Sequence, residues 1–456
     1  MIKPRPLSGF PEYLPAQQLT FNRVLSVIRS TYEAHGFTPI ETPSAELKDV
    51  LTAKGGDDAE IYALTRLNGA PDERETDLAL HFDLSVPLAR YVAQREGELT
   101  FPFLRSQVQK VWRGERPQAG RFREFYQADI DVIGRGSLSL LYDAVLPAVV
   151  NDALTRLDIG PFCIRINNRQ LLQGYFEGLG LAPEAVPQAL RILDRLEKVG
   201  LDRVREGLTT EFRLDPAALA PFFDLATGRP DPHALLTELE GWAFGVTFER
   251  GVSELKAVLS GLRDQGVPTP NFRMDLSVAR GLGYYTGTVY ETTLPDFPQL
   301  GSICSGGRYE NLVGNFHRGA FPGAGMSIGV SRFVPALLEA GVLGVGASTT
   351  AQVLVTSLQA EHRGEALRLG AELRAQDVRA EVYLEPHRLG QQLRYADRKG
   401  FRLAVMVGEE ELQAGRVRVK DLRSGEETLL ERTQWSQEVR QRLCPPDAIR
   451  SRAGPR

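Results

Sequence analysis

The sequence predicts an α+β protein of three parts: an antiparallel sheet flanked by helices, a helical insertion within it, and a C-terminal α/β domain. Strand and helix patterns do not alternate regularly in the first 340 or so residues, whereas Leu, Ala, Glu and Arg recur at helical spacing from about residue 170 to 262. Beyond about residue 350, strands alternate with helices. The expected boundaries are 1–170 with 263–340 for the sheet domain, 171–262 for the insertion, 341–350 for a linker, 351–445 for the α/β domain and 446–456 for a tail.

The sheet domain begins with elements that end at glycine or proline. Apolar residues at helical spacing predict a helix over residues 19–34 that stops at Gly36. Pro39 and Pro43 then punctuate a short strand in "FTPIETPSAE". The elements expected next are, in order, the strand "LALHFDL", a helix from Val86, the strands "SQVQKVWR" and "FREFYQADIDVIG", and a helix over 137–157.

The insertion is predicted to be mostly helical, with breaks at Gly200, at Pro216 and at the "GRPDPH" turn. After it we expect the strands "NFRMDLSV", "YYTGTVYETT" and "GSICSGGRY", and a helix that begins within "GAGMSIGVSRFVPALLEAG". The C-terminal domain is expected to contain, in order, strand "QVLVTS", a helix over 361–375, strand "RAEVYL", a helix over 389–399, strands "RLAVMVG" and "GRVRVKDL", and a helix over 433–443.

Composition excludes several classes of protein. Hydrophobic residues make up 42% of the 456 residues and charged residues 25%, which is ordinary for a globular protein and unlike a disordered chain or a coiled coil. The longest apolar stretch, near residues 138–150, is interrupted by Asp143 and is too short to cross a bilayer, so no membrane association is expected. The first residues lack the apolar segment of a signal peptide.

The cysteines and the charge distribution indicate the compartment and the class of partner. Cys163, Cys304 and Cys444 lie far apart, which argues against a disulfide framework and a Cys-based zinc site, so we expect a reduced, cytoplasmic protein. The net charge is −4, yet residues 351–456 carry a small excess of basic side chains. This excess permits nucleic-acid binding by the C-terminal domain without requiring it.

The common catalytic templates are absent, and arginines beside glycines and aromatic residues stand out instead. In "VWRGERPQAGRFREFYQADID", four arginines crowd a strand–loop–strand: Arg113, Arg116, Arg121 and Arg123. Period-2 alternation on the second strand puts five side chains on one face, namely Arg123, Phe125, Gln127, Asp129 and Asp131. That face is a plausible floor for a ligand, and a solvated hairpin with ordinary ion pairs is the alternative.

Three further segments join glycines to an arginine. "SVARGLGYYTGTVYE" places Arg280 in a glycine-flanked turn before two tyrosines, where a purely structural turn is the alternative. "CSGGRYENLVGNF" pairs glycines with an arginine, and "PGAGMSIGVSRF" runs small residues into a helix near Arg332, where backbone N–H groups suit a phosphate or carboxylate. Together these segments predict a site in which several guanidinium groups hold a polyphosphate.

Several of these motifs also resemble a known family. "GFTPIETP", "HFDLSVPLARYV", "WRGERPQAGRFREFYQADID", "ARGLGYYTGTVYE", "GSICSGGRYENLVGNF" and "GMSIGVSRF" are similar, in order and spacing, to the motifs of histidyl-tRNA synthetases, a class II aminoacyl-tRNA synthetase family. The tail segments "LGQQLRYADRKG", "VMVGEEEL" and "VRVKDLRSGEE" resemble its anticodon-binding domain. The resemblance covers about residues 5–440, and the arginine with the double tyrosine is its most specific part.

The resemblance implies a role for each matching residue. In ATP binding the implied residues are Arg113 at the α-phosphate and the amino-acid carboxylate, Glu115 at the adenine amino group, Phe125 stacked on adenine, and Arg332 at the γ-phosphate. For histidine they are Asp83, Ser85 and Gln127 at the α-amino group, Asp131 and Tyr285 at the imidazole with Tyr284 beside them, and Arg113 and Arg280 at the reacting carboxylate and phosphate. Arg116 and Gln118 are implied to reach the tRNA acceptor end, and Pro43 to close a dimer-interface motif.

The implied function is a histidine–tRNA ligase, a homodimer that uses ATP with Mg²⁺ to activate L-histidine and then transfers it to the 3′ end of tRNA(His). Two positions depart from the family: Ser85 replaces a common threonine, and Gly283 replaces an aspartate. The alternatives are a non-catalytic, histidine-sensing regulator of the ATP phosphoribosyltransferase type and a general RNA-binding adaptor. Retention of Arg113, Arg280 and Arg332, together with the C-terminal domain, favours the ligase.

Overall fold

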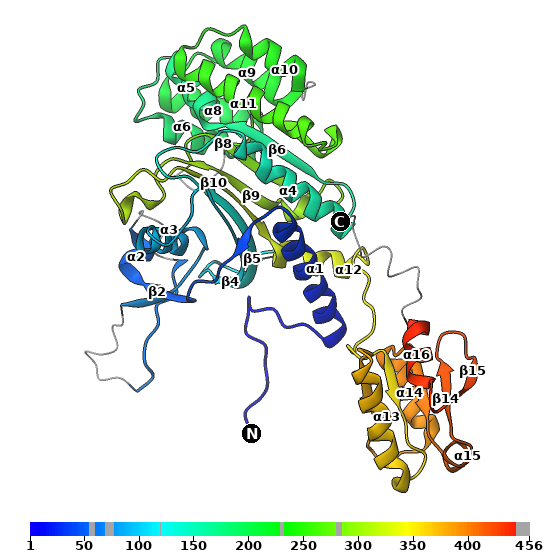
Figure 1. The fold of residues 1–456 in the computed structure, drawn as a ribbon. Helices are drawn as coiled ribbons and strands as arrows, with labels where there is room; N and C mark the ends of the chain where they lie inside the picture. The colour runs from blue at the N-terminus through cyan, green and yellow to red at the C-terminus, as the bar shows by residue number, and fades with distance from the viewer. Residues whose placement is uncertain (54–59, 69–76, 119, 229–231, 280–284, 444–456) are drawn as a thin grey trace. The chain divides into compact units, whose positions relative to one another are not determined.

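The computed structural model describes residues 1–53, 60–68, 77–118, 120–228, 232–279 and 285–443 (Figure 1). Contacts divide the chain into two compact units, one of residues 1–12 and 24–343, the other of residues 13–23 and 344–456. Each unit is described by itself. No helix in the described ranges is both long enough and apolar enough to cross a bilayer.

The first unit is built on a mixed sheet that has eight strands in its described part. Its strands in spatial order are β1 (Thr38–Pro39), β4 (Phe103–Trp112), β5 (Glu124–Ile133), β10 (Gly323–Gly329), β9 (Ser302–Tyr309), β8 (Thr288–Thr293), β6 (Cys163–Asn168) and β7 (Phe272–Met274). The interior pairs are antiparallel, as predicted, whereas β1–β4 and β6–β7 at the two edges are parallel. The parallel edge pair β6–β7 follows from the insertion, because parallel neighbours need a long crossover between them.

Helices cover this sheet, and a small second sheet lies beside it. The helices of this unit outside the insertion are α1 (Pro15–Ala34), of which the part from Val24 onward belongs to this unit, α2 (Lys48–Thr52), α3 (Ser85–Arg95), α4 (Tyr142–Leu157) and α12 (Val330–Glu339). Strands β2 (Ala45–Leu47) and β3 (Leu78–Leu80) pair only with each other. Short 3₁₀ helices occupy Thr269–Asn271, Pro298–Leu300 and Val313–Asn315.

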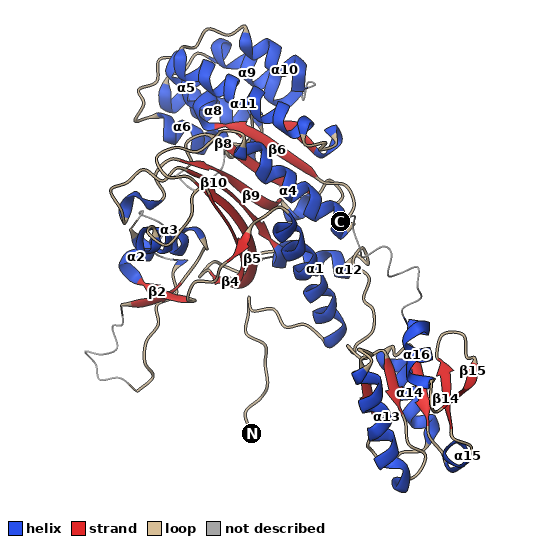
Figure 2. Cartoon of the chain, in the orientation of Figure 1, coloured by secondary structure: helices blue, strands red, loops and turns tan. Residues whose placement is uncertain are grey.

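The insertion is helical, as predicted, and its helices cluster at the β6–β8 side of the sheet (Figure 2). They are α5 (Arg169–Gly178), α6 (Val186–Leu193), α7 (Leu196–Val199), α8 (Leu201–Phe212), α9 (Pro216–Gly228), α10 (Pro232–Glu240) and α11 (Val246–Asp264). Helices α5 and α11 approach closely because two glycines lie at their contact. A Cβ at Gly174 would lie 2.3 Å from the backbone nitrogen of Phe248, and one at Gly251 would lie 2.2 Å from that of Leu171.

The sequence missed one strand in this unit. The predicted helix begins late within "GAGMSIGVSRFVPALLEAG", at Val330, where α12 starts, and the residues before it, "GAGMSIG", form strand β10. The buried residues Ala324, Met326 and Ile328 alternate along β10, a period-2 pattern that its glycines obscure. The helix predicted over 137–157 also begins later, at Tyr142.

The second unit is an α/β domain with a five-stranded sheet of order β12-β11-β13-β14-β15. Its elements along the chain are β11 (Val353–Val355), a 3₁₀ helix (Ala360–His362), α13 (Arg363–Ala375), β12 (Ala380–Val382), α14 (Leu389–Lys399), β13 (Leu403–Met406), α15 (Glu409–Gln413), β14 (Arg416–Asp421), β15 (Glu427–Glu431) and α16 (Trp435–Leu443). The predicted elements are all present. The sequence missed α15 and β15, since β15 buries only Leu430 and so shows little hydrophobic pattern.

Candidate active site

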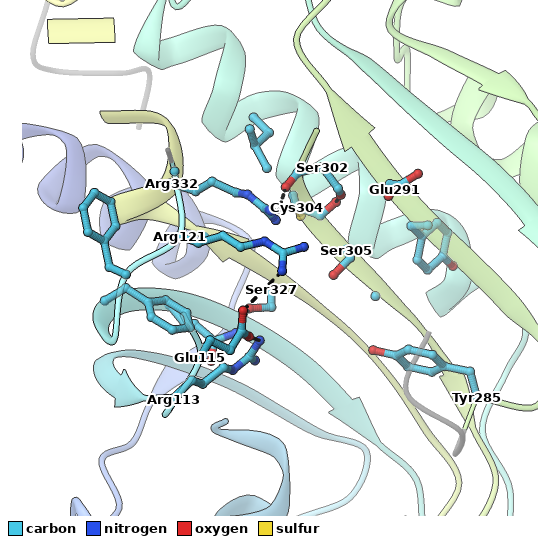
Figure 3. A pocket seen from close by; sticks show the side chains of 18 residues that line it. Arg113, Glu115, Arg121, Tyr285, Glu291, Ser302, Cys304, Ser305, Ser327 and Arg332 are labelled. Atoms are coloured by element: carbon cyan, nitrogen blue, oxygen red, sulfur yellow. Dashed lines mark hydrogen bonds and ion pairs between the residues drawn. The ribbon is translucent and has the colours of Figure 1, made fainter. Parts of the chain in front are cut away.

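A cavity of about 310 Å³ opens on the sheet of the first unit (Figure 3). The hairpin of β4 and β5, the strands β8–β10 and the first turn of α12 form its walls. The residues with predicted roles that line it are Arg113, Glu115, Phe125, Gln127, Tyr285 and Arg332. Side chains that are distant in the sequence therefore meet in one space.

Arg113 follows the last residue of β4, and its neighbours fix its direction. Its Nε donates a hydrogen bond to the Phe82 carbonyl oxygen at 3.0 Å. Its guanidinium carbon lies 5.2 Å from the centre of the Phe125 ring, within the range of a cation–π contact. Nη1 lies 3.7 Å from Glu115 Oε1. The guanidinium is thus oriented at the cavity wall by contacts on several sides.

Two further arginines reach the same cavity. Arg332 lies in the first turn of α12, and its Nη1 donates to the Ser302 carbonyl oxygen at 2.8 Å. Arg121 has its Nη1 3.3 Å from Glu115 Oε2, and its guanidinium lies between Arg332 and Ser327 in Figure 3. Arg121 was noted in the sequence as one of the crowded arginines but was given no role. Three cations from the described residues therefore line one wall, an arrangement suited to a polyphosphate.

A second, smaller space of about 20 Å³ adjoins the first, and Tyr285 and Ser327 line both. The other residues at this space are Ser85, Asp129, Asp131, Tyr309, Gly325 and Met326. Tyr309 donates its hydroxyl to Asp131 Oδ1 at 2.9 Å, and Arg105 Nη2 lies 2.6 Å from Asp131 Oδ2. Burial raises the pKa of Asp131 to about 6, although Arg105 and the Tyr309 hydroxyl oppose the shift.

The residues predicted for the α-amino group lie around the start of α3 and on β5. Asp83 is buried, and its Oδ1 accepts a hydrogen bond from the Val86 backbone N–H at 3.0 Å. Ser85 is the first residue of α3 and lines the smaller space. Gln127 Nε2 donates to Ser327 Oγ at 2.8 Å, which fixes the amide against β10.

Glycines opposite these side chains make room for them. A Cβ at Gly325 would lie 2.1 Å from Asp131 Oδ1, and a Cβ at Gly307 would lie 2.8 Å from the Tyr285 ring. Neither contact is one that a real side chain makes. Gly307 and Gly325 are therefore required by the close approach of Tyr285 and Asp131 to the neighbouring strands.

Arg280, Gly283 and Tyr284 lie outside the described residues, so their predicted roles stay predictions. The segment that leads to them is fixed by the beginning of the insertion. Asn167 Nδ2 donates to the carbonyl oxygens of residues 276 and 278 at 3.1 and 3.0 Å, and Arg169 Nη1 donates to that of residue 279 at 2.9 Å.

Arg116 and Gln118 are exposed and lie outside the lining of the cavity. The backbone of Gln118 pairs in both directions with that of Arg121, which forms the tight end of the β4–β5 hairpin. Their predicted contact with tRNA stays a prediction.

Sequence reasoning missed several residues of the site. Glu291 lines the cavity from β8, with Oε2 3.2 Å from Arg165 Nη1, and Ser302 and Ser305 line it from β9. Arg105 and Asp129 lie at the smaller space or directly beneath it. The period-2 pattern had placed Asp129 on the correct face of its strand. Its neighbour Arg105 lies on another strand, and a contact between strands depends on their register, which the spacing within one segment does not show. Among the described residues, no group of three or more His, Cys, Asp or Glu side chains is arranged to hold a metal ion.

Comparisons with known proteins agree with this geometry. A family model described as histidyl-tRNA synthetase matches residues 9–333, and one described as an anticodon binding domain matches residues 352–442. A histidine–tRNA ligase of Stenotrophomonas maltophilia is 47% identical over 437 residues, which are 92% of this chain and 94% of that protein. The crystal structure of histidyl-tRNA synthetase from Nostoc sp. PCC 7120 is 41% identical, has a TM-score of 0.88, and is matched over 97% of this chain and 100% of that one. A Bacillus halodurans structure shares the fold, and its title reads ATP phosphoribosyltransferase regulatory subunit/histidyl-tRNA synthetase. It is 22% identical, has a TM-score of 0.69, and is matched over 83% of this chain and 93% of that one.

Proposed function

The chain belongs to the histidyl-tRNA synthetase family, and from that premise we propose which of its residues activate histidine and transfer it to tRNA. The chain is a class II histidine–tRNA ligase that depends on ATP, with an anticodon-binding domain at its C-terminal end. The regulator and the adaptor considered above are set aside, because relatives that cover more than nine-tenths of the chain are ligases.

In our proposal ATP occupies the larger cavity. Phe125 stacks on adenine, Glu115 accepts from its amino group, Arg113 bridges the α-phosphate and the histidine carboxylate, and Arg332 contacts the γ-phosphate. The presence of all four side chains in one lining supports this placement. Arg121 lies beside Arg332 and Glu115, so we add it as a further contact of the polyphosphate.

Histidine occupies the smaller space, enlarged on binding. Its α-amino group meets Asp83, Ser85 and Gln127, and its ring lies between Asp131 and Tyr285, with Tyr284 beside them. The order of Gln127, Asp129 and Asp131 along one face of β5 supports this direction of binding, with the ring farthest from the ATP cavity. We propose that Arg113 and Arg280 act on the reacting groups from opposite sides.

The first reaction is an in-line displacement. The histidine carboxylate attacks the α-phosphorus of ATP, the bond to the bridging oxygen breaks, and pyrophosphate leaves. The carboxylate needs no general base, so the side chains position the reactants and stabilise the charge that develops on the α-phosphate oxygens. The ribose hydroxyl of the terminal tRNA adenosine then attacks the histidyl carbonyl, and AMP leaves.

Mg²⁺ fits this cavity as a partner of the nucleotide. Mg²⁺ binds substrate phosphates together with one or two carboxylates. Glu115 and Glu291 are the carboxylates among the described lining residues, and Glu291 faces the phosphate side from β8. When bound, the ion would neutralise charge on the β- and γ-phosphates.

The remaining partners are proposed on the family relationship. Arg116 and Gln118, exposed at the tip of the β4–β5 hairpin, contact the tRNA acceptor end. The chain forms a homodimer through the motif that Pro43 closes, where Pro43 is exposed in the single chain. It acts in the cytoplasm, where a thiol such as that of the buried Cys304 stays reduced.

The observation that carries the proposal is the single lining that joins three arginines and Phe125 to the acidic smaller space. It is tested by exchange of labelled pyrophosphate into ATP. We expect exchange that requires L-histidine and is not supported by other amino acids. Histidine binding without exchange in the presence of ATP and Mg²⁺ would contradict the proposed catalytic site.

A further inference from the structure

A buried charged cluster lies at the floor of the smaller space. It consists of Arg105 on β4 and of Asp129 and Asp131 on β5, whose side chains are 0%, 4% and 5% exposed. Arg105 Nη2 lies 2.6 Å from Asp131 Oδ2 and 4.0 Å from Asp129 Oδ2. One guanidinium therefore faces two carboxylates, and the pair would keep an excess negative charge if both were ionised.

One oxygen of this cluster lacks a partner. Asp129 Oδ1 is buried and accepts no hydrogen bond from any residue in the described ranges, although Asp129 lines the same space as Asp131 and Tyr285. A buried carboxylate oxygen without a partner is unfavourable, because it has lost its hydrogen bonds to water and gained none in the protein. The oxygen thus needs a proton, either on its own carboxyl group or on a group of a bound molecule.

The surroundings of Asp129 supply no second cation within the described part of the chain. The charged, titratable and polar groups that face it are Arg105, Asp131, Asp83, Tyr32, Tyr309, Cys304, Tyr285 and Ser327. Burial raises the pKa of the Tyr32 and Tyr309 hydroxyls and of the Cys304 thiol, so these groups are neutral at pH 7. Burial also raises the pKa of Asp129 to about 7, although Arg105 opposes the shift.

We propose that Asp129 is a specificity-determining residue of the histidine pocket, through which the site takes the imidazole ring in its protonated, cationic form. The inference rests on the proposed function, which places the ring in this space. In the complex, Asp129 and Asp131 are both ionised and face two cations, Arg105 and the imidazolium. In the empty pocket, a proton on Asp129 takes the place of the second cation.

The proton balance of binding then depends on pH. Near pH 7 and below, the proton that Asp129 holds in the empty pocket passes to the imidazole, whose ordinary pKa is about 6.5. Above that range, empty Asp129 is already ionised and the free ring is neutral, so binding must take up a proton from solvent. Histidine affinity therefore falls as the pH rises above 7, approaching a tenfold loss per pH unit.

Isothermal titration calorimetry with L-histidine and the full-length chain tests this, in buffers of different ionisation enthalpy from pH 6.5 to 8. We expect a slight proton release at pH 6.5 and an uptake approaching one proton at pH 8. In Asp129→Asn the uptake at pH 8 should be near zero. Its preference for histidine over the 1,2,4-triazole analogue, whose ring is far less basic, should fall about tenfold. Asp152→Asn, which changes a half-exposed aspartate paired with His35, should behave as the unaltered chain.

The outcomes separate this inference from the proposed function. Normal histidine affinity without proton uptake at pH 8, or equal uptake in Asp129→Asn, would overturn the inference and leave the ligase assignment intact. Failure of the unaltered chain to bind histidine at all would count against the proposed pocket itself. The measurement on the unaltered chain decides the question even if Asp129→Asn fails to fold.

Discussion

Each arginine that lines the larger cavity in the described part of the chain is held by a neighbour before any substrate binds. Arg113 donates to a backbone carbonyl and lies over Phe125, Arg332 donates to the carbonyl of Ser302, and Arg121 pairs with Glu115. A donor that is already oriented costs no reorganisation when charge develops in the transition state. Substitutions at these residues should therefore affect rate as well as affinity.

Asp131 is expected to act on histidine alone. A pocket built to hydrogen-bond a substrate group loses most of its discrimination when that bond is removed. We predict that Asp131→Ala raises the histidine KM by about 10² or more and the ATP KM by no more than a few-fold. Steady-state pyrophosphate exchange at varied histidine and varied ATP measures both constants. Equal rises in the two would refute the assignment, and Asp152→Ala serves as the surface control.

Arg280 is expected to act on the chemical step. A guanidinium opposite Arg113 would stabilise the α-phosphate from the far side, and loss of one such donor costs about 10²–10³ in rate. We predict that Arg280→Ala lowers kcat for adenylate formation by about that factor with modest changes in KM, and that Arg280→Lys recovers only part. Single-turnover adenylate formation with pre-bound histidine is the measurement. A near-normal rate in Arg280→Ala would mean that the residue is structural.

At the scale of elements, close packing of α5 on α11 depends on Gly174 and Gly251. A methyl group at Gly251 would overlap the backbone of Leu171, and such overpacking typically costs about 1–3 kcal/mol. We predict that Gly251→Ala lowers the thermal unfolding midpoint. Gly364→Ala is the matched control, because Gly364 is also helical and nothing lies within 4 Å of its Cβ position. That control should leave the midpoint unchanged or raise it, since alanine favours the helix. Equal shifts in the two variants would contradict the packing argument.

The sequence predicted most elements correctly because their hydrophobic periods are long and uninterrupted. The helix 389–399 has the predicted bounds, and β4, β5 and β9 lie within or near their predicted segments. Strand β10 was not predicted, because its glycines carry no side-chain pattern. The parallel edges of the sheet could not be predicted, because strand order is not visible in local spacing.

The same limit applies to the site. One hairpin carries Arg113, Glu115, Phe125 and Gln127. The alternation along its second strand and the position of its loop were therefore enough to predict from the sequence that these side chains lie close together. Arg105 faces Asp131 only through the register of β4 against β5. Glu291 likewise reaches the cavity through the position of β8, and no spacing within one segment predicts either contact.

At the scale of the whole molecule, the proposed reaction site and the match to an anticodon-binding domain lie in different units. The cavity lies entirely within the first unit, whereas the anticodon-binding match lies in the second. We predict that deletion of residues 351–440 leaves histidyl-adenylate formation largely intact and cripples transfer to tRNA. Aminoacylation and pyrophosphate exchange measured side by side test this. A truncated chain that charges tRNA at the full-length rate would refute it, and for the full-length chain tRNA affinity should fall as salt rises.

The parallel pairing of β6 with β7 has a consequence for how this chain could be engineered. The insertion leaves the sheet at β6 and returns at the adjacent strand, with Ile166 opposite Met274, so its two ends are neighbours. Such a module could be exchanged for a different one without altering the register of the strands that flank it. It could not be replaced by a tight hairpin, because parallel strands need a crossover of a dozen or more residues. The shortest viable graft would thus keep one helix to bridge the edge, together with Asn167 and Arg169, which hold the segment that leads to Arg280.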